Sequence, residues 1–362
     1  TGNGRGLTES QICQIETLRN AGRLPLPEDM VEKDILVAEA VRTVCETGKS
    51  RGAQIIFAGG TSLSQAHQVI QRMSEDADFR IVLPPDVTSQ NQRRNFLSAI
   101  KTDIVQAMEQ SGFLLDGDLK ARNSNAYIMG NFAYTSAFVQ SETLRATSLR
   151  PLIKLEITAF DPLSPVVDLP LQTILDRVLD RPTDPALPAV PVIRIEDTLA
   201  DKVVGYLRRT AADRAGCGRG DYDDRLVRHL YDVHCVLQKK GEISEIVAPL
   251  FVQTVERDKD TYGNQFPAFK KDPFGILQDE REHLYDDVTK DRYERFCRAM
   301  IYGNIPSFQE VADTFYAFSG KLLAMAREVY PEQVSNEEAE HIRKEGSATI
   351  QKMTSFQGKS EI

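Results

Sequence analysis

The chain has 362 residues, of which 44 are Lys or Arg and 53 are Asp or Glu, so its formal net charge is −9. This acidic balance excludes a protein that coats nucleic acid along its whole surface, and any RNA contact needs a local basic patch. No apolar run is long enough to cross a bilayer. Five scattered cysteines lack Cys-x-x-Cys spacing, which argues for reduced thiols in a cytoplasm and against zinc; they are Cys13, Cys45, Cys217, Cys235 and Cys297.

Two helices are expected before the first strand. Residues 1–27 contain a short helix, and the apolar spacing over residues 28–47 predicts a longer one. The first turns of the longer helix carry Glu32, Lys33 and Asp34. Acids there suit the helix dipole, and a functional role for these three charges is the alternative.

A strand, a glycine turn and a helix follow. Residues 55–58 form an apolar run long enough for a buried strand, and Gly59 and Gly60 interrupt it. Thr61 or Ser62 can cap the next helix, because a hydroxyl accepts hydrogen bonds from the unpaired amides of a first turn. Apolar residues at three- and four-residue steps predict that this helix continues for several turns; they are Leu63, Ala66, Val69, Ile70 and Met73.

An acidic pair leads into the second strand, which we expect at residues 79–83. Asp76 and Asp78 should point the same way, because side chains alternate along an extended chain. Two converging carboxylates suit magnesium, which usually takes one or two carboxylates plus phosphate oxygens. The amides of the turn at residues 59–62 offer an anion site nearby. A phosphate cradle beside a metal-binding pair is the minimum equipment for phosphoryl or nucleotidyl transfer.

The pairing of GGTSLS with SEDADF resembles the nucleotidyltransferase signature of the DNA polymerase β-like superfamily. It is more closely similar to the AbiEii/AbiGii family, the toxins of type IV toxin–antitoxin and abortive infection systems. The alternative is a plain strand–turn–helix with a solvated acidic loop. The resemblance implies an α+β fold, with a mixed or antiparallel sheet and helices followed by a mainly helical C-terminal domain. It also implies two Mg²⁺ ions and a nucleoside triphosphate substrate.

The middle of the chain supplies a third acid. We expect a helix at residues 91–110, short strands near 126–129 and 133–139, and a clear strand at 151–160. In this last strand Lys154 and Glu156 share one face. The resemblance implies that Glu156 is the third metal ligand and that Lys154 lies beside it at the nucleotide. The alternative is a Lys–Glu pair on an edge strand that faces water.

A proline-rich stretch at residues 180–191 reads as a linker, which places a nucleotidyltransferase core with N-terminal helices at 1–185 and a helical domain at 186–362. Beyond it, the resemblance implies that Lys202 binds the nucleotide phosphates from a helix at 197–210, with a surface lysine as the alternative.

The segment RHLYDV lies on a helix expected at residues 225–237 and is similar to the family's R-D-L-Y-D-L stretch. Asp232 matches the second acid of that stretch and His229 replaces the first, so His229 is doubtful as a site residue. Tyr231 and the apolar stripe around it are expected to be core.

Two further features concern RNA. Six arginines could grip RNA phosphates, or form a salt-bridged surface with neighbouring aspartates; they are Arg208, Arg209, Arg214, Arg219, Arg225 and Arg228. A loop at residues 266–274 has aromatic and basic residues suited to a nucleobase or RNA, although such aromatics more often anchor a loop. Closing helices are expected at 307–329 and 336–353.

These patterns and the resemblance together predict a growth-inhibiting, Mg²⁺-dependent nucleotidyltransferase toxin. Asp76, Asp78 and Glu156 hold the metal, and Ser62 with the turn amides binds the phosphates. Lys202 steadies the phosphates, and Asp232 orients Lys202 or helps to deprotonate the acceptor. The resemblance implies a tRNA 3′ end as acceptor and an opposing antitoxin. The alternatives are nucleotidylation of a protein hydroxyl, a kinase-like transfer, and a nucleotide-binding regulator without catalysis.

Overall fold

The computed structural model describes residues 4–138, 150–184, 186–218 and 220–329. These residues form two compact units. The first takes the chain up to Thr198 together with 297–305, and the second takes 199–296 and the described residues from 306 onward. The division between the two units falls between Thr198 and Leu199, and the proline-rich stretch carries a strand of the first unit's sheet.

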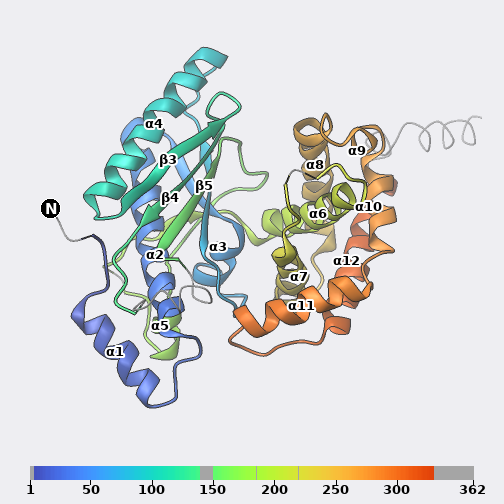
Figure 1. Cartoon of the computed structure of the whole chain (residues 1–362). Helices are drawn as coiled ribbons and strands as arrows, with labels where there is room; N and C mark the ends of the chain where they lie inside the picture. The colour runs from blue at the N-terminus through green and yellow to red at the C-terminus, as the bar shows by residue number, and fades with distance from the viewer. Residues whose placement is uncertain (1–3, 139–149, 185, 219, 330–362) are drawn as a thin grey trace, which may run out of the picture. The chain divides into compact units, whose positions relative to one another are not determined.

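The first unit is built on a mixed seven-stranded sheet in the order β3-β4-β5-β2-β1-β7-β6 (Figure 1). Its strands are β1 (Gln54–Ala58), β2 (Asp76–Val82), β3 (Leu114–Arg122), β4 (Tyr127–Ala133), β5 (Leu152–Thr158), β6 (Val167–Leu169) and β7 (Val190–Val192). Its helices are α1 (Glu9–Asn20), α2 (Glu28–Thr47), α3 (Gly59–Gln65), α4 (Gln90–Gln110) and α5 (Ile174–Val178), with a 3₁₀ turn at Gly48–Arg51. β2 runs antiparallel to β1 and parallel to β5.

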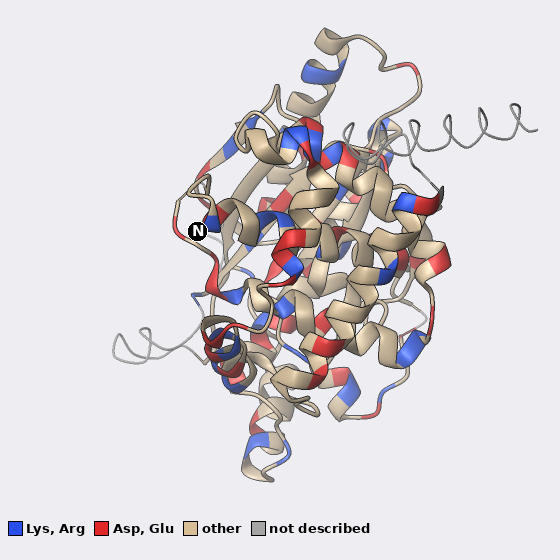
Figure 2. Cartoon of the chain, turned by 90° about the vertical axis from the view of Figure 1, so that its right-hand side faces the viewer, with Lys and Arg blue, Asp and Glu red and all other residues tan. Residues whose placement is uncertain are grey.

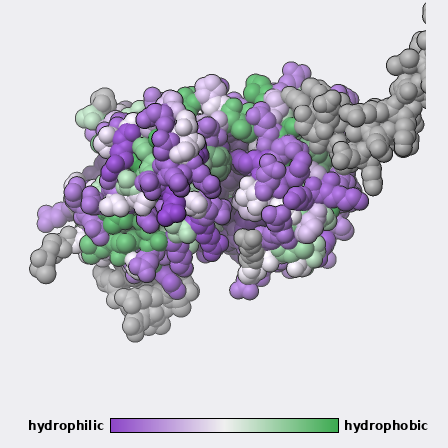
Figure 3. Space-filling view, turned by 90° about the horizontal axis from the view of Figure 1, so that it is seen from above, coloured by the Kyte–Doolittle hydropathy of each residue, from purple (hydrophilic) through white to green (hydrophobic). Residues whose placement is uncertain are grey.

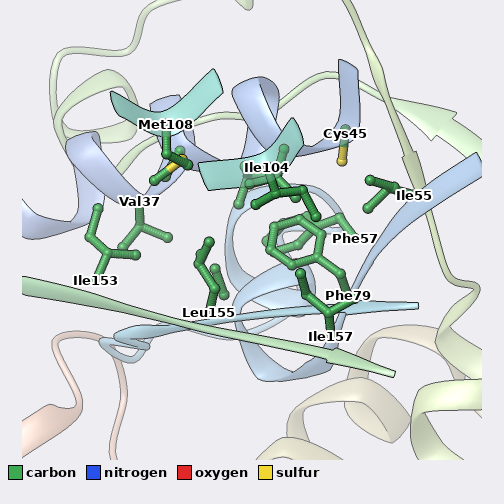
Figure 4. Packing of buried hydrophobic residues seen from close by; sticks show 14 of the residues in the cluster. Val37, Cys45, Ile55, Phe57, Phe79, Ile104, Met108, Ile153, Leu155 and Ile157 are labelled. Atoms are coloured by element: carbon green, nitrogen blue, oxygen red, sulfur yellow. The ribbon is translucent and has the colours of Figure 1, made fainter. Parts of the chain in front are cut away.

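Helices α2 and α4 pack on one face of this sheet (Figure 4). Side chains from the central strands meet side chains of both helices there, and all of them are almost fully buried. Phe57 of β1 and Phe79 of β2 lie at the centre, with their ring centroids 6.0 Å apart. The expected α+β core is thus confirmed, and the polar residues of β2 and β5 are left for the opposite face.

The segment between the glycine turn and β2 differs from the prediction. Helix α3 ends at Gln65 instead of continuing to Met73, and the backbone turns with Gln68 at φ 54°. The apolar residues beyond it are still buried, because the chain pairs there with residues 300–302. The Met73 N–H donates to Met300 O at 2.8 Å, and the Tyr302 N–H donates to Gln71 O at 3.1 Å.

Strand boundaries also shift. β2 begins at Asp76, three residues before the expected start, so the acidic pair lies inside the strand. Residues 114–122 form a full strand that pairs with β4, where only short pieces were expected. β4 ends at Ala133, so no strand covers residues 134–138, and Val139 lies outside the described residues.

The second unit is helical in its described part. Its elements are α6 (Ile195–Arg214), α7 (Arg228–Lys240), α8 (Ser244–Tyr262), α9 (Pro267–Lys271), α10 (Pro273–Arg281), α11 (Asp287–Met300) and α12 (Phe308–Val329), with a 3₁₀ turn at Asp224–Val227. Helix α12 packs against α7 and α8, and Tyr231 is buried as expected. The ends of α6 and α11 belong to the first unit. The helix expected at 336–353 lies outside the described residues.

The segment predicted as a nucleobase-contacting loop is helical instead, and its aromatic residues are buried. Residues 266–274 form α9 and the start of α10, and the aromatic rings of this segment point into the core. Phe266, Phe269 and Phe274 are at most 4% exposed. Buried rings cannot stack on an incoming base, so this segment anchors the helices and offers no aromatic platform.

The arginine cluster is largely neutralised by neighbouring acids. Arg209 and Arg228 both pair with Asp223, at 3.3 and 2.9 Å. Arg208 and Arg214 likewise pair with acids on α8 and α10, and Arg219 lies outside the described residues. Figure 2 shows acidic and basic residues mixed over these helices, without a single basic face. The salt-bridged surface is the interpretation that fits these paired arginines.

Viewed from above, hydrophilic residues predominate on the visible face, with hydrophobic ones in small groups (Figure 3). Among the described helices, none is both long and apolar enough to span a bilayer.

Candidate active site

The polar face of the sheet gathers the acidic residues on two neighbouring strands. Ala77 and Phe79 of β2 point into the core, so Asp76 and Asp78 lie on the opposite face. On the adjoining parallel strand β5, Lys154 is the register partner of Asp76 and Glu156 is the register partner of Asp78. Neighbouring strands are about 4.8 Å apart, so one small patch of sheet presents three carboxylates and one ammonium group.

The glycine turn presses directly against this patch. Gly59 has φ +72°, and a Cβ added there would lie 2.0 Å from Oδ2 of Asp78. Ala58 is the register partner of Asp78 on β1, which explains why the turn after β1 ends up over that carboxylate. Position 59 therefore requires glycine for two reasons: the backbone has a positive φ, and the Asp78 carboxylate leaves no space for a Cβ.

The two hydroxyls of the turn hold it in place instead of capping α3. The Thr61 hydroxyl donates to the backbone carbonyl of Asp76 and lies 2.8 Å from Oγ of Ser74. The fully buried Ser62 donates to Gly59 O at 2.8 Å. These bonds tie the start of α3 to the start of β2, so the turn and the acidic pair form one rigid element.

Sequence reasoning missed Arg72, which brings a positive charge to the turn. Arg72 is 2% exposed, and its Nη2 would lie 2.3 Å from a Cβ added to Gly60. Its Nη1 donates to Met73 O at 3.0 Å. The sequence feature that could have revealed Arg72 is its position within an apolar stretch, between Ile70 and Met73. A guanidinium group buried there needs hydrogen-bond acceptors, so it marks a polar site.

Lys154 and Glu156 form an ion pair on the polar face. The alternative interpretation of a Lys–Glu pair on an edge strand is right about the pair but wrong about the edge, because β5 lies between β4 and β2. The Tyr127 hydroxyl donates to Oε2 of Glu156 at 3.2 Å, and burial together with the Glu156 charge raises the pKa of Tyr127 to about 12. Burial alone would lower the pKa of Lys154, but Glu156 and the charge of Asp76 raise it above its usual value.

Two of the three carboxylates on this face are suitable ligands for a hard divalent cation. Asp76 and Asp78 supply the carboxylate oxygens that Mg²⁺ prefers, and phosphate oxygens usually complete its shell. In the described residues no group of three His, Cys, Asp or Glu side chains is placed to hold a metal ion. Glu156 is held by Lys154 and Tyr127, so it could join the two aspartates only after the Lys154 pair opens.

The charged start of α2 turns out to be buried structure. Lys33 donates to Glu75, the neighbour of Asp76, at 2.9 Å. Asp34 accepts from the side chain of Gln65, the last residue of α3, at 2.9 Å. Burial raises the pKa of both Glu32 and Asp34. Lys33 and Asp34 therefore hold the start of β2 and the end of α3, whereas Glu32 accepts from Ser136 and Ala137.

The other two predicted catalytic residues pair within the second unit. Nζ of Lys202 lies 2.6 Å from Oδ2 of Asp232, with the two side chains 6% and 0% exposed. Nδ1 of His229 lies 3.1 Å from Lys202 O. The alternative of a surface lysine is therefore wrong, because Lys202 on α6 is enclosed by α7.

Breaking this buried pair should strongly destabilise the protein. We expect Asp232→Ala to lower the free energy of unfolding by about 3–5 kcal/mol, because it leaves an ammonium group buried without its counter-charge. The control is Asp223→Ala, which breaks half-exposed pairs and should cost about 1 kcal/mol or less. Urea unfolding measures both. Equal losses in the two variants would contradict a buried, mutually dependent pair.

His229 gives the second unit a pH-dependent stability. Burial, followed by the positive charge of Lys202, holds the pKa of His229 well below its usual range. Below about pH 6.5 the unfolded chain therefore protonates His229 and the folded chain does not. The contribution of this group to the free energy of unfolding is fully present above that pH and decreases as the pH falls below it. We expect a slope of about 1.4 kcal/mol per pH unit from this group. Burial also lowers the pKa of His234, which adds with the same sign. Urea unfolding at pH 7.5 and 5.5 should show a smaller loss for His229→Asn, and an unchanged loss would contradict this assignment.

The family model described as nucleotidyl transferase AbiEii toxin, type IV TA system, matches residues 49–314. No curated protein matches the chain. The fold is similar to that of MenT4, a nucleotidyltransferase toxin from Mycobacterium tuberculosis H37Rv, with a TM-score of 0.51 and 15% identity over 93% of this chain and 99% of that one.

A nucleotidyltransferase-like protein from Paracoccidioides brasiliensis gives a TM-score of 0.31 at 9% identity, over 67% of this chain and 92% of that one, which is too low to support an argument. The MenT4 likeness supports the fold alone. The family match covers most of the chain and includes the glycine turn, the acidic pair and the Lys202–Asp232 pair. The chain belongs to the AbiEii nucleotidyltransferase toxin family of type IV toxin–antitoxin systems.

Proposed function

We propose that this nucleotidyltransferase moves a nucleoside monophosphate from a nucleoside triphosphate to the 3′ end of tRNA, with Mg²⁺ held by Asp76 and Asp78. The observation that carries the proposal is the packing of the Gly59 turn against the Asp78 carboxylate, with Asp76 on the same face. A phosphate bound over the turn would then lie next to the metal ligands. Mg²⁺ there would activate the acceptor hydroxyl and neutralise the triphosphate.

The chain's own residues divide the remaining work. The amides of Gly59, Gly60 and Thr61 would donate to the phosphates, and Ser62 fixes the turn through its bond to Gly59 O. Lys154 would move from Glu156 to the triphosphate as the substrate enters, which frees Glu156 as the third carboxylate. In such transfers most of the rate comes from positioning and charge neutralisation.

Lys202 and Asp232 remain predicted catalytic residues. Their support is the family match and their own geometry, because a lysine held at 2.6 Å by a fully buried aspartate is fixed in position. Lys202→Arg keeps the charge but changes its shape, so a loss of transfer with retained folding would favour catalysis over a structural role.

The Lys154 exchange predicts a change in metal binding. We expect Lys154→Met to bind Mn²⁺ about tenfold more tightly when no nucleotide is present, because a positive charge beside Asp76 and Glu156 is removed. The same variant should bind the triphosphate more weakly. Calorimetric titration measures both constants, and Lys120→Met on the exposed edge strand β3 is the control. Unchanged Mn²⁺ affinity in Lys154→Met would contradict the exchange.

The acceptor is tested by sequencing RNA 3′ ends after incubation of total RNA with each nucleotide. Added nucleotides on tRNA would support the proposal. A labelled protein band with unmodified RNA would instead favour nucleotidylation of a protein hydroxyl. Growth arrest on expression, relieved by a gene encoded beside this one, would support a cytoplasmic toxin with a separate antitoxin. Growth arrest that persists in the Asp76→Asn variant would argue against an enzymatic cause.

A further inference from the structure

A cavity of about 430 Å³ lies in the first unit, and none of its lining residues belongs to β2, the strand that carries the acidic pair. Its walls come from α1 and the segment before it, from α2, from the chain just after α4, and from α5 with the residues on either side of it. The charged residues of its lining are Arg5, Glu39, Arg42, Asp176 and Arg181. The lining therefore has three basic and two acidic side chains, a formal excess of one positive charge.

Two of the three arginines are matched to the two carboxylates. Arg5 donates through Nε to Oε2 of Glu39 at 2.6 Å. Nη1 of Arg181 lies 3.9 Å from Oδ1 of Asp176, whose other oxygen accepts from the Thr173 hydroxyl at 2.6 Å. The acids of the cavity are thus engaged by other donors.

Arg42 is the exception among these arginines. Its Nε is buried and has no hydrogen-bond partner in the described structure. Its Nη2 has only a long bond of 3.5 Å to Leu171 O. Burial lowers the pKa of Arg42, although Glu39 and Asp176 act in the opposite direction. Nη1 of Arg42 also has no hydrogen-bond partner in the described structure, and unlike Nε it is not enclosed, so an oxyanion in the cavity can accept from this end of the guanidinium group.

We propose that this cavity binds a small molecule through a phosphate group, with the Arg42 guanidinium as its main donor. Planar guanidinium groups match phosphate oxygens in a two-bond geometry. The hydroxyls of Thr43 and Ser111, 3.4 Å apart in the lining, add further polar partners. The volume exceeds that of a bare phosphate and lies in the range of small-ligand pockets, so the ligand is a phosphate monoester of mononucleotide size.

Calorimetric titration of the full chain with inorganic phosphate, AMP and adenosine tests this proposal. We expect phosphate and AMP to bind and adenosine to fail. Arg42→Met should weaken both by at least about tenfold, and Arg42→Lys should lie between wild type and Arg42→Met, because it keeps the charge without the planar fork. The control is Arg19→Met, which removes a half-exposed arginine paired with Glu28 at 2.8 Å and should bind like wild type.

Melting curves guard against a folding artefact. With EDTA present to keep divalent metal out of the catalytic site, phosphate should raise the melting temperature of wild type and Arg19→Met but not of Arg42→Met. AMP binding that is unchanged in Arg42→Met would overturn the proposal, and so would adenosine binding as well as AMP. If Arg42→Met melts far below wild type, the decision rests on Arg42→Lys, whose affinity for phosphate must then fall. This experiment compares AMP affinity between wild type and the Arg42 variants. A result that contradicts the cavity proposal therefore leaves the catalytic proposal at Asp76 and Asp78 unchanged.

Discussion

Asp76→Asn and Asp78→Asn should each reduce nucleotide transfer by on the order of 10²–10³-fold while the protein stays folded. Each change keeps the shape of the side chain on the polar face but removes the negative charge that a divalent cation requires. The measurement is incorporation of labelled nucleotide into total RNA with Mg²⁺ present. Increasing the Mg²⁺ concentration should restore part of the lost rate, because weaker metal binding is the cause.

The control is Asp116→Asn, which changes an exposed acid of the same sheet, on edge strand β3. It should transfer nucleotide at the wild-type rate. The melting temperatures of all three variants should lie within a few degrees of wild type, because asparagine keeps the size and shape of each aspartate side chain. Full activity in Asp76→Asn would contradict a metal-binding role for the pair.

Gly59→Ala should lower the transfer rate by about 10²-fold, because the new methyl group would lie 2.0 Å from Oδ2 of Asp78 and must displace that carboxylate. A displacement on the order of 1 Å costs this much when reacting groups must be aligned. Gly59 also has φ +72°, so alanine there adds backbone strain of about 1 kcal/mol. Initial rates of labelled-nucleotide transfer, together with urea unfolding, separate the two effects.

Gly117→Ala is the matched control for the strain. Gly117 has φ +78°, close to that of Gly59, but no atom lies within 4 Å of an added Cβ. Gly117→Ala should therefore lose only the stability due to strain, Gly59→Ala should lose more because of its clash with Asp78, and only Gly59→Ala should lose activity. If Gly117→Ala lost as much activity, strain in the sheet would explain the effect and the contact with Asp78 would not.

Local sequence patterns were sufficient to predict the elements that have a clear hydrophobic periodicity of their own. The strand at residues 151–160 and the helix at 28–47 have clear periodicity, and both are present as β5 and α2. The family resemblance also anticipated Asp232 as a partner for Lys202, which the helical spacing alone could not supply. The paired acids were visible because Asp-x-Asp after a glycine turn has a period of two.

Elements held by distant segments could not be predicted in this way. The apolar spacing after Leu63 fits a helix, but backbone bonds to residues 300–302 replace that helix beyond Gln65. The start of β2 was missed because Asp76 and Asp78 disfavour a strand, and the pairing with β5 overrides that preference. Lys33 was one of three charges at an ordinary helix start, and only its partner Glu75, 42 positions away, shows that it is buried.

The most direct test of the central claim is a crystal structure with Mn²⁺ and a non-hydrolysable nucleoside triphosphate, in which anomalous scattering locates the metal. We expect Mn²⁺ within about 2.2 Å of carboxylate oxygens of Asp76 and Asp78, with triphosphate oxygens completing its shell over the Gly59 turn. Lys154 should no longer contact Glu156 in this complex. Mn²⁺ bound elsewhere, or a triphosphate bound away from the turn with no metal at the two aspartates, would contradict this claim.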